Sequence, residues 1–277
     1  MGKFMKRKGE QGVTLVELMI VVAIMGIVVG AMYSMFNFQR HNYTVQDNMA
    51  VLQQNVRIGL EYVVKETRMA GYIPEDIPGA TNWGMEPSAE PPVPAPHNDG
   101  IVESIEEATA SSIYFQADID DDEWTDAVRY TLDYDASKNS TNLIREAWNW
   151  DGGSWNAADL DGDTVADGPQ VIADNIDNLV FTYSVLAVGG VNGAGYGDSV
   201  DDDGDGTTDE AGELLQWNFG THGSLDSDAE RRYIRNVHVR MTARSPVQDG
   251  KYFHPDTGDH FRRKTLTSNI SVRNMQN

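Results

Sequence analysis

One carboxylate stands inside a long apolar segment near the start of the chain. From Val13 to Phe36 there are 24 residues, and Glu17 is the only charged one among them. A carboxylate held near the centre of a bilayer costs about 2.5–3.5 kcal/mol, so a charge kept in such a segment is by default a functional site. Glu17 is therefore the first residue to which we assign a role.

Acidic loops offer a second kind of chemistry, the binding of a hard cation. Three segments place Asp at loop positions 1, 3, 5 and 9, and Ca²⁺ takes six to eight oxygen ligands. They are Asp201, Asp203, Asp205 and Asp209, then Asp159, Asp161, Asp163 and Asp167, then Asp118, Asp120, Asp122 and Asp126. Only the first of these has glycine, Gly206, at the turn position 6. None has the Glu of an EF-hand at position 12, so the likeness is to a short Asp-rich calcium loop. The alternative is a set of solvated acidic turns, and no cofactor other than Ca²⁺ is indicated.

The composition argues against several other classes of protein. The 277 residues include no cysteine and carry a formal net charge of −22, which excludes disulfides and thiolate metal sites and is opposite to the basic footprint of nucleic-acid-binding proteins. The six histidines show no paired zinc spacing, and no nucleophile elbow or phosphate-binding glycine loop occurs. We therefore predict a protein that is not an enzyme and does not bind nucleic acid.

A long helix must position Glu17. The 24 apolar residues from Val13 to Phe36 would span roughly 36 Å as a helix, enough to cross a hydrocarbon core of about 30 Å. Apolar residues then continue at three- and four-residue steps, which predicts an amphipathic second half. They are Val45, Met49, Leu52, Val56, Leu60 and Val63. No proline occurs between Val13 and Ile73, so we expect one helix over 13–71, membrane-spanning over 13–36, with Gly71 as the stop.

The rest of the chain, 72–277, reads as a β-rich head. Seven of the ten prolines lie in 72–100, which predicts a long surface loop. Branched and aromatic residues then indicate strands at Ser112–Ala117, Ala127–Tyr134, Asn142–Trp148, Leu179–Leu186, Ile234–Arg244 and Lys264–Arg273. Two of these segments, Ile234–Arg244 and Lys264–Arg273, alternate apolar and polar residues, which favours an antiparallel sheet with one face against the amphipathic half of the helix. The predicted fold class is α+β, a long N-terminal helix packed on an antiparallel sheet.

The residues around Glu17 also carry a family resemblance. A basic leader ends at Gly12, and the sequence Val13-Thr14-Leu15-Val16-Glu17-Leu18 follows it. This arrangement resembles the type IV prepilin signal. The leader holds four basic residues and one acidic residue, a net charge of +3, and positive-inside bias would keep it in the cytoplasm. The apolar run is longer than that of an ordinary secretory signal, and the cleavage point lies before it.

The resemblance implies a pathway of processing and assembly. A prepilin peptidase would remove residues 1–12 and methylate the new amine of Val13. Glu17 would pair with the N-terminal amine of a neighbouring subunit, and the expected partners are other major and minor pilins and the inner-membrane assembly platform. The protein would be a single-pass inner-membrane protein with a periplasmic head, and later part of an extracellular pilus.

Looser similarities extend into the head. Segments Val171–Phe181, Ile234–Met241 and Arg262–Asn274 are similar to PilW-type minor pilins. They favour a minor type IV pilin that helps to initiate or cap pilus assembly. Two alternatives stay open: a J-type minor pseudopilin of type II secretion, and a calcium-dependent adhesin carried on the pilus, which the Asp loops and the tryptophans Trp148, Trp150 and Trp155 suggest.

Overall fold

The computed structural model describes residues 12–72, 105–119, 126–150, 155–157, 168–186, 214–217, 231 and 234–272. The chain divides into two units, residues 1–48 and residues 49–277. Helix α1 (Leu15–Thr67) is continuous in the backbone and contributes its first part to one unit and its last turns to the other. The leader before Gly12 and the greater part of the proline-rich segment lie outside the described residues.

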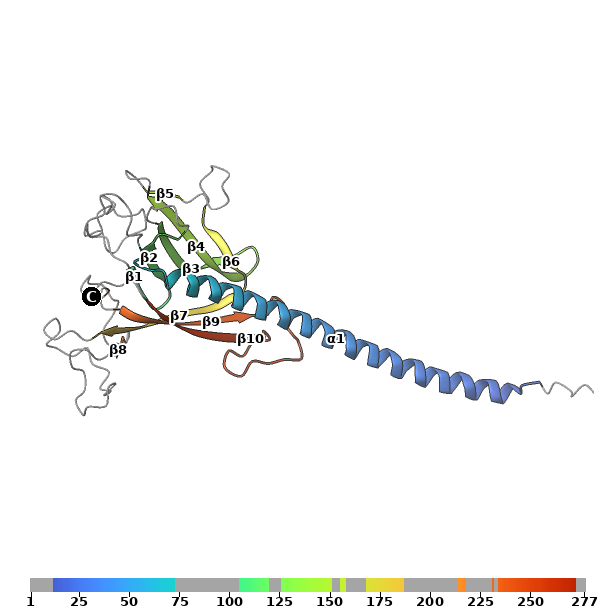
Figure 1. Ribbon diagram of the computed structural model, residues 1–277. Coiled ribbons are helices and arrows are strands. Elements are labelled where there is room, and N and C mark those ends of the chain that lie inside the picture. The colour runs from blue at the N-terminus through green and yellow to red at the C-terminus, as the bar shows by residue number, and fades with distance from the viewer. Residues whose placement is uncertain are drawn as a thin grey trace, which may run out of the picture. The chain divides into compact units, whose positions relative to one another are not determined.

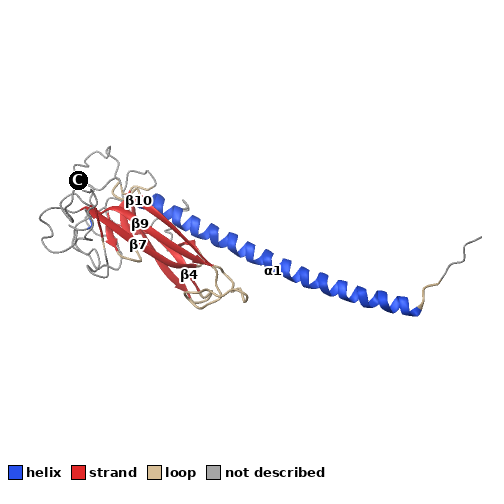
Figure 2. Ribbon diagram, turned by 90° about the horizontal axis from the view of Figure 1, so that it is seen from below, coloured by secondary structure: helices blue, strands red, loops and turns tan. Residues whose placement is uncertain are grey.

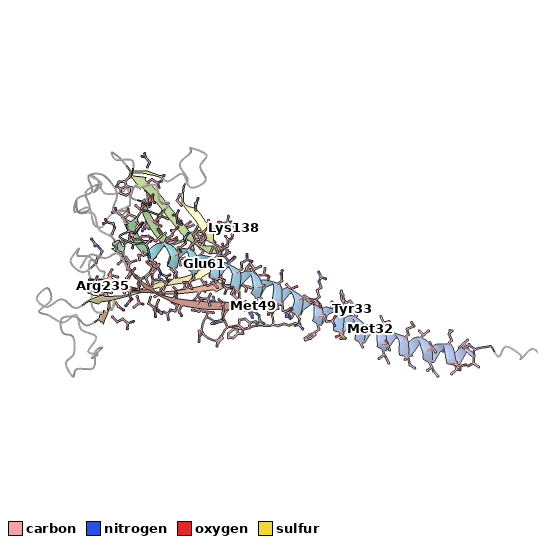
Figure 3. All side chains as sticks on the ribbon, viewed as in Figure 1. Met32, Tyr33, Met49, Glu61, Lys138 and Arg235 are labelled. Atoms are coloured by element: carbon pink, nitrogen blue, oxygen red, sulfur yellow. The ribbon has the colours of Figure 1, made fainter. Side chains whose placement is uncertain are left out.

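The first unit presents an apolar helix with its side chains exposed. From Leu15 to Phe38 every large apolar side chain of α1 is exposed, including Met32 and Tyr33, which project outward in Figure 3. Such a helix has no core of its own, because its apolar surface covers its whole circumference. It needs lipid or other helices around it.

The described residues of the second unit form ten strands in two antiparallel sheets (Figure 1). The strands are β1 (Ile105–Ala108), β2 (Ile113–Ala117), β3 (Asp126–Asp135), β4 (Ser140–Trp150), β5 (Trp155–Ala157), β6 (Gln170–Ala173), β7 (Ile176–Leu186), β8 (Leu214–Gln216), β9 (Ile234–Arg244) and β10 (Arg263–Ser271). One sheet has the order β1-β2-β3-β4-β5, with β6 also paired to β4. The other has the order β10-β9-β7-β8, and Figure 2 shows β10, β9 and β7 side by side.

The core of this unit forms where the last turns of α1 meet both sheets. Leu52, Val56 and Val63 are buried in one cluster with side chains of β2, β3, β4, β7 and β9. Gly59 marks the closest approach, since a Cβ there would lie 3.0–3.1 Å from Met241 Sδ, Ala173 Cβ and Leu143 Cδ2. The amphipathic stripe predicted from the sequence is therefore the face of the helix that packs on the sheets.

All six predicted strands are present, and the predicted α+β fold class is confirmed. The alternation in β9 is also confirmed, because Val237, Val239, Met241 and Ala243 are all buried. The structure differs in having two sheets instead of one, and in four further strands, β1, β5, β6 and β8. Those four have three or four residues each, which is too few for an alternation of apolar and polar residues to be recognised in the sequence.

A buried ion pair fastens the end of α1 to the larger sheet. Glu66, only 6% exposed, accepts hydrogen bonds from Tyr130 Oη at 2.5 Å and from Arg145 Nε at 2.9 Å. Burial, reinforced by the charge of Glu66, raises the pKa of Tyr130 well above its usual value. Burial acts to lower the pKa of Arg145, but the hydrogen bond and charge of Glu66 outweigh it and raise that pKa. Three polar groups from α1, β3 and β4 thus satisfy one another inside the core.

The helix stops in a turn that joins it to the sheet. Its last helical residue is Thr67, four residues before the predicted stop at Gly71. Gly71 has φ of 76°, in the left-handed region that favours glycine. Its N–H donates to the Gln116 carbonyl at 2.8 Å, and the Tyr72 carbonyl accepts from the N–H of Asp118 at 2.9 Å. Residues 71–72 therefore lie beside the end of β2.

Candidate assembly site at the helix N-terminus

The start of α1 is closed by a reciprocal hydrogen-bonded pair, Thr14 and Glu17. The Thr14 hydroxyl accepts from the Glu17 N–H at 3.3 Å. In return, Glu17 Oε2 accepts from the Thr14 N–H and from the Thr14 hydroxyl, both at 3.4 Å. The Thr14 carbonyl accepts the first helical bond, from Leu18 N–H at 3.1 Å. This is a capping box, in which a Thr before the helix and a Glu three residues later satisfy each other's backbone donors.

Two effects stabilise the Glu17 carboxylate at this place. It satisfies an N–H group that the helix cannot bond, and it lies at the positive end of the helix dipole. The bonds are long and exposed, so each is weak. Within the described part of the chain no cation lies at ion-pair distance from Glu17, and Thr14 is its hydrogen-bond partner.

Sequence reasoning identified Glu17 and missed Thr14. The signal was available, because Thr-x-x-Glu before an apolar run is itself the pattern of a capping box. Gly12 and Val13, predicted to flank the cleavage point, are exposed and precede the first helical residue. A peptidase would therefore meet non-helical backbone at Gly12 and Val13.

The surroundings of the site are apolar. α1 is long and apolar enough to cross a membrane, and its apolar stretch is not buried within the structure. A carboxylate at the start of such a helix has little water around it once lipid or other helices cover the apolar surface. In that setting a cation brought to Glu17 interacts more strongly than it would in water.

The predicted calcium loops fall largely outside the described residues. This holds for the two loops at Asp201, Asp203, Asp205 and Asp209 and at Asp159, Asp161, Asp163 and Asp167. Of the third loop, Asp118 and Asp126 are described and buried, at the facing ends of β2 and β3. Asp126 Oδ2 accepts from the N–H of Ile119 at 2.9 Å. Among the residues with a described position, no three His, Cys, Asp or Glu side chains form a group that could hold a metal.

Comparison with protein families agrees with the geometry of the helix start. Residues 7–33 match the family model of the prokaryotic N-terminal methylation motif. The comparison with curated proteins found no match, and neither did the comparison with solved structures. The matched segment contains Gly12, Val13, Thr14 and Glu17.

The match supports a type IV prepilin-like protein, of the pilin or pseudopilin kind. It implies processing by a prepilin peptidase and pilin partners in general, and it suggests a structural, non-enzymatic protein. The apolar helix near the N-terminus fits a pilin anchored in a membrane.

Proposed function

We propose that this chain is a minor type IV pilin, a structural subunit that helps to initiate or cap pilus assembly. The observation that carries the proposal is the methylation motif over residues 7–33, placed on the exposed apolar stretch of α1, in which Glu17 is the only carboxylate. Its head, with two sheets around the end of α1, is the part that would face away from the membrane.

In the proposed mechanism, cleavage after Gly12 creates a free amine at Val13, which is then methylated and keeps its positive charge. Glu17 of an adjacent subunit accepts that amine as an ion-pair partner. The two charges attract strongly in a low-dielectric surrounding, and pairing removes the penalty of leaving each of them alone. Because the bonds from Thr14 to Glu17 are long, exchanging them for a charged partner costs little.

Two features support a minor pilin over a major pilin. The segments that resemble PilW-type minor pilins coincide with β6–β7, β9 and β10, so the similarity follows the framework of the head instead of its loops. The length of the chain after the helix, about 200 residues, also favours a large minor pilin over a major pilin. The closest alternative is a minor pseudopilin of type II secretion, which shares the helix and the assembly step.

The test is the variant Glu17→Ala. We expect it to insert into the inner membrane as the wild type does, and to be lost from sheared surface filaments, because the docking charge is gone while the apolar helix remains. Immunoblots of the membrane and filament fractions measure both. Glu61→Ala, an exposed carboxylate further along α1, is the matched control. Normal incorporation of Glu17→Ala, or a mature chain that still begins at Met1, contradicts the proposal.

A second candidate is a calcium-dependent adhesin on the pilus. Trp148 packs edge-on against Tyr114, with 6.2 Å between ring centroids, so it belongs to the sheet. Trp155, partly exposed on the short strand β5, is better placed to meet a ligand. Trp155→Ala should then abolish surface attachment and spare piliation, whereas unchanged attachment argues against this candidate.

A further inference from the structure

The larger sheet has a second face, opposite the one that packs in the core. Side chains alternate between the two faces of a strand, so Arg129, which lies between the core residues Val128 and Tyr130 of β3, belongs to this outer face. Its cross-strand partners are Tyr114 of β2 and Glu146 of β4. A guanidinium group therefore lies at the centre of a row of side chains that crosses three strands.

The donors of Arg129 are not satisfied by the groups around it. Its Nη2 lies 3.6 Å from Glu107 Oε2 and its Nη1 lies 3.7 Å from Glu146 Oε2, which are ion-pair distances too long for hydrogen bonds. Its Nε is buried and has no hydrogen-bond partner in the described part of the chain. Because the large majority of buried polar atoms are hydrogen-bonded, this guanidinium lacks an acceptor that it would be expected to have.

A buried acceptor without a donor lies on the same face. Gln116 is 1% exposed, and its Nε2 donates to Glu106 Oε1 at 2.6 Å. Its Oε1 is also buried and, among the residues that the structure describes, accepts from no donor. The cross-strand partner of Gln116 is Ala127, two residues before Arg129, so the two unsatisfied groups occupy adjacent rows of the sheet. Each needs a partner that the other does not supply.

The row around Arg129 can be reached from solvent and is bordered by aromatic rings. The side chains of Arg129 and Glu146 are 20% and 24% exposed, so a ligand can contact them while much of the water is kept away. Trp148, two residues after Glu146 and half-buried, packs edge-on against Tyr114 with 6.2 Å between ring centroids. A few polar groups beside aromatic carbon are the usual composition of a small-molecule site.

We propose that this row binds a neutral saccharide, with Arg129 and Glu146 as its main polar contacts. A hydroxyl group both accepts and donates hydrogen bonds, so neighbouring hydroxyls of one sugar can accept from Arg129 and donate to Glu146 and Glu107. An anionic ligand is repelled, since two carboxylates face one guanidinium, and a cationic ligand offers Arg129 no acceptor. The C–H groups of the sugar ring bury apolar surface against Trp148.

The inference goes beyond the proposed assembly role and does not depend on it. It also uses other residues than the adhesin candidate, which relies on Trp155. An ordered water molecule can satisfy the same donors and acceptors, so the binding measurement has to distinguish a saccharide from water.

The experiment presents the full chain to an array of neutral, amino and acidic saccharides. The chain is kept in a phosphocholine detergent, because detergents with sugar headgroups would compete for the site. We expect binding to neutral saccharides alone, and titration calorimetry with the strongest of them then gives the Kd. No binding, or binding confined to acidic or amino saccharides, overturns the proposal.

Substitutions assign the binding to this row. Arg129→Met and Glu146→Gln should each weaken binding of the neutral saccharide by about tenfold or more, since each removes a hydrogen bond to a charged group. Arg240→Met changes an exposed arginine on β9 and is the matched control, for which we expect an unchanged Kd. Thermal melts identify a variant that fails to fold, and Glu146→Gln, at the more exposed position, still tests the site if Arg129→Met is lost in this way.

A Kd that folded Arg129→Met and Glu146→Gln both leave unchanged also overturns the proposal. If the binding is lost instead in Trp155→Ala, the saccharide belongs to β5 and this inference fails. Incorporation of Arg129→Met into filaments should match the wild type, so failure of this inference and failure of the proposed function are separate results.

Discussion

Thr14 and Glu17 show how one carboxylate can serve two states of the chain. In the separate subunit it completes the cap of α1, with bonds of 3.3–3.4 Å to Thr14. In the proposed filament the same carboxylate receives an amine from a neighbour. The cap therefore keeps the charge satisfied until a better partner arrives, and it orients the carboxylate toward the end of the helix where that partner would come.

If Thr14 and Glu17 cap α1 in the separate subunit, removal of the Thr14 hydroxyl should loosen the start of the helix. Thr14→Ala removes the capping hydroxyl, and loss of such a cap costs about 1 kcal/mol. The amide groups of Glu17 and Leu18, which donate to Thr14, should then exchange hydrogen faster in detergent micelles, about fivefold by that free energy, while those of the last turns of α1 stay as they were. Thr14→Ser keeps the hydroxyl and should behave as the wild type. Equal exchange in Thr14→Ala and the wild type would show that the cap does not hold the helix start.

Two buried tyrosines predict how stability depends on alkaline pH. Burial and Glu66 raise the pKa of Tyr130, and burial and Glu107 raise that of Tyr183. The folded chain therefore keeps phenol protons that the unfolded chain releases above about pH 10, so the free energy of unfolding falls as the pH rises past that value. The limiting slope is about 1.4 kcal/mol per pH unit for each phenol.

The check is denaturant unfolding between pH 8 and 11. Replacing both tyrosines with Phe should flatten the loss above about pH 10, although it also removes the hydrogen bond to Glu66 and lowers stability at neutral pH. Tyr62→Phe and Tyr134→Phe, at exposed positions, should keep the wild-type slope. An equal slope in the wild type and in the variant without Tyr130 and Tyr183 would mean that neither phenol titrates differently on unfolding.

At the scale of the elements, the packing of α1 on the sheets depends on one missing side chain. Gly59→Ala places a methyl group 3.0–3.1 Å from atoms of Met241, Ala173 and Leu143. In a helix, alanine is more stable than glycine by roughly 0.5–1 kcal/mol, whereas overpacking a core typically costs about 1–3 kcal/mol. The second effect is larger, because all three contacts are with side chains of strands, β9, β6 and β4.

We therefore expect Gly59→Ala to lower the free energy of unfolding of the head by about 1 kcal/mol. Thermal melts of the full chain in detergent measure it. Gly26→Ala and Gly30→Ala lie in the same helix with no neighbouring atom within 4 Å of the added Cβ, and should not lower the melting temperature. A higher melting temperature for Gly59→Ala would show that the sheets yield to the methyl group.

The elements also show what sequence can and cannot predict. The helix follows from its periodicity, and the six longer strands follow from their branched and aromatic residues, because both signals lie in neighbouring residues of the chain. Strand β1 was missed since its sequence, Ile-Glu-Glu-Ala, looks solvated, yet Glu106 and Glu107 are buried. Glu106 accepts a hydrogen bond from the Gln116 side chain, and Glu107 accepts one from the Ser112 hydroxyl. Glu66 is similar: its partner Arg145 is 79 residues away, a pairing that no local pattern reveals. At the candidate site, Glu17 was predictable from its cost in lipid, and Thr14 from a short capping pattern.

At the scale of the whole molecule, the formal net charge of −22 fits acidic loops that bind divalent cations. If the loops at Asp159–Asp167 and Asp201–Asp209 bind calcium, as the sequence predicts, calcium must stabilise the folded chain, since a ligand that prefers the folded state raises the free energy of unfolding. Millimolar calcium should then raise the melting temperature of the full chain in detergent, and a chelator should reverse the effect.

Two controls separate binding from a general salt effect. Magnesium at equal concentration should raise the melting temperature less, because it demands a smaller and stricter coordination shell. Asp205→Asn should reduce the response to calcium. No shift at millimolar calcium would remove the calcium prediction and leave the proposed assembly role unaffected.

Strand β10 lies at one end of its sheet, and its position bears on how the head avoids aggregation. Among the described strands β10 pairs with β9 alone, so it is an edge strand in this part of the structure. An open edge invites uncontrolled strand addition by unrelated chains, and charged residues on the edge are a known protection. Here Arg263 and Lys264 begin the strand, and Thr265, Thr267 and Asn269 point exposed polar groups outward. If the head is exported as proposed, these side chains would protect it from aggregating before assembly.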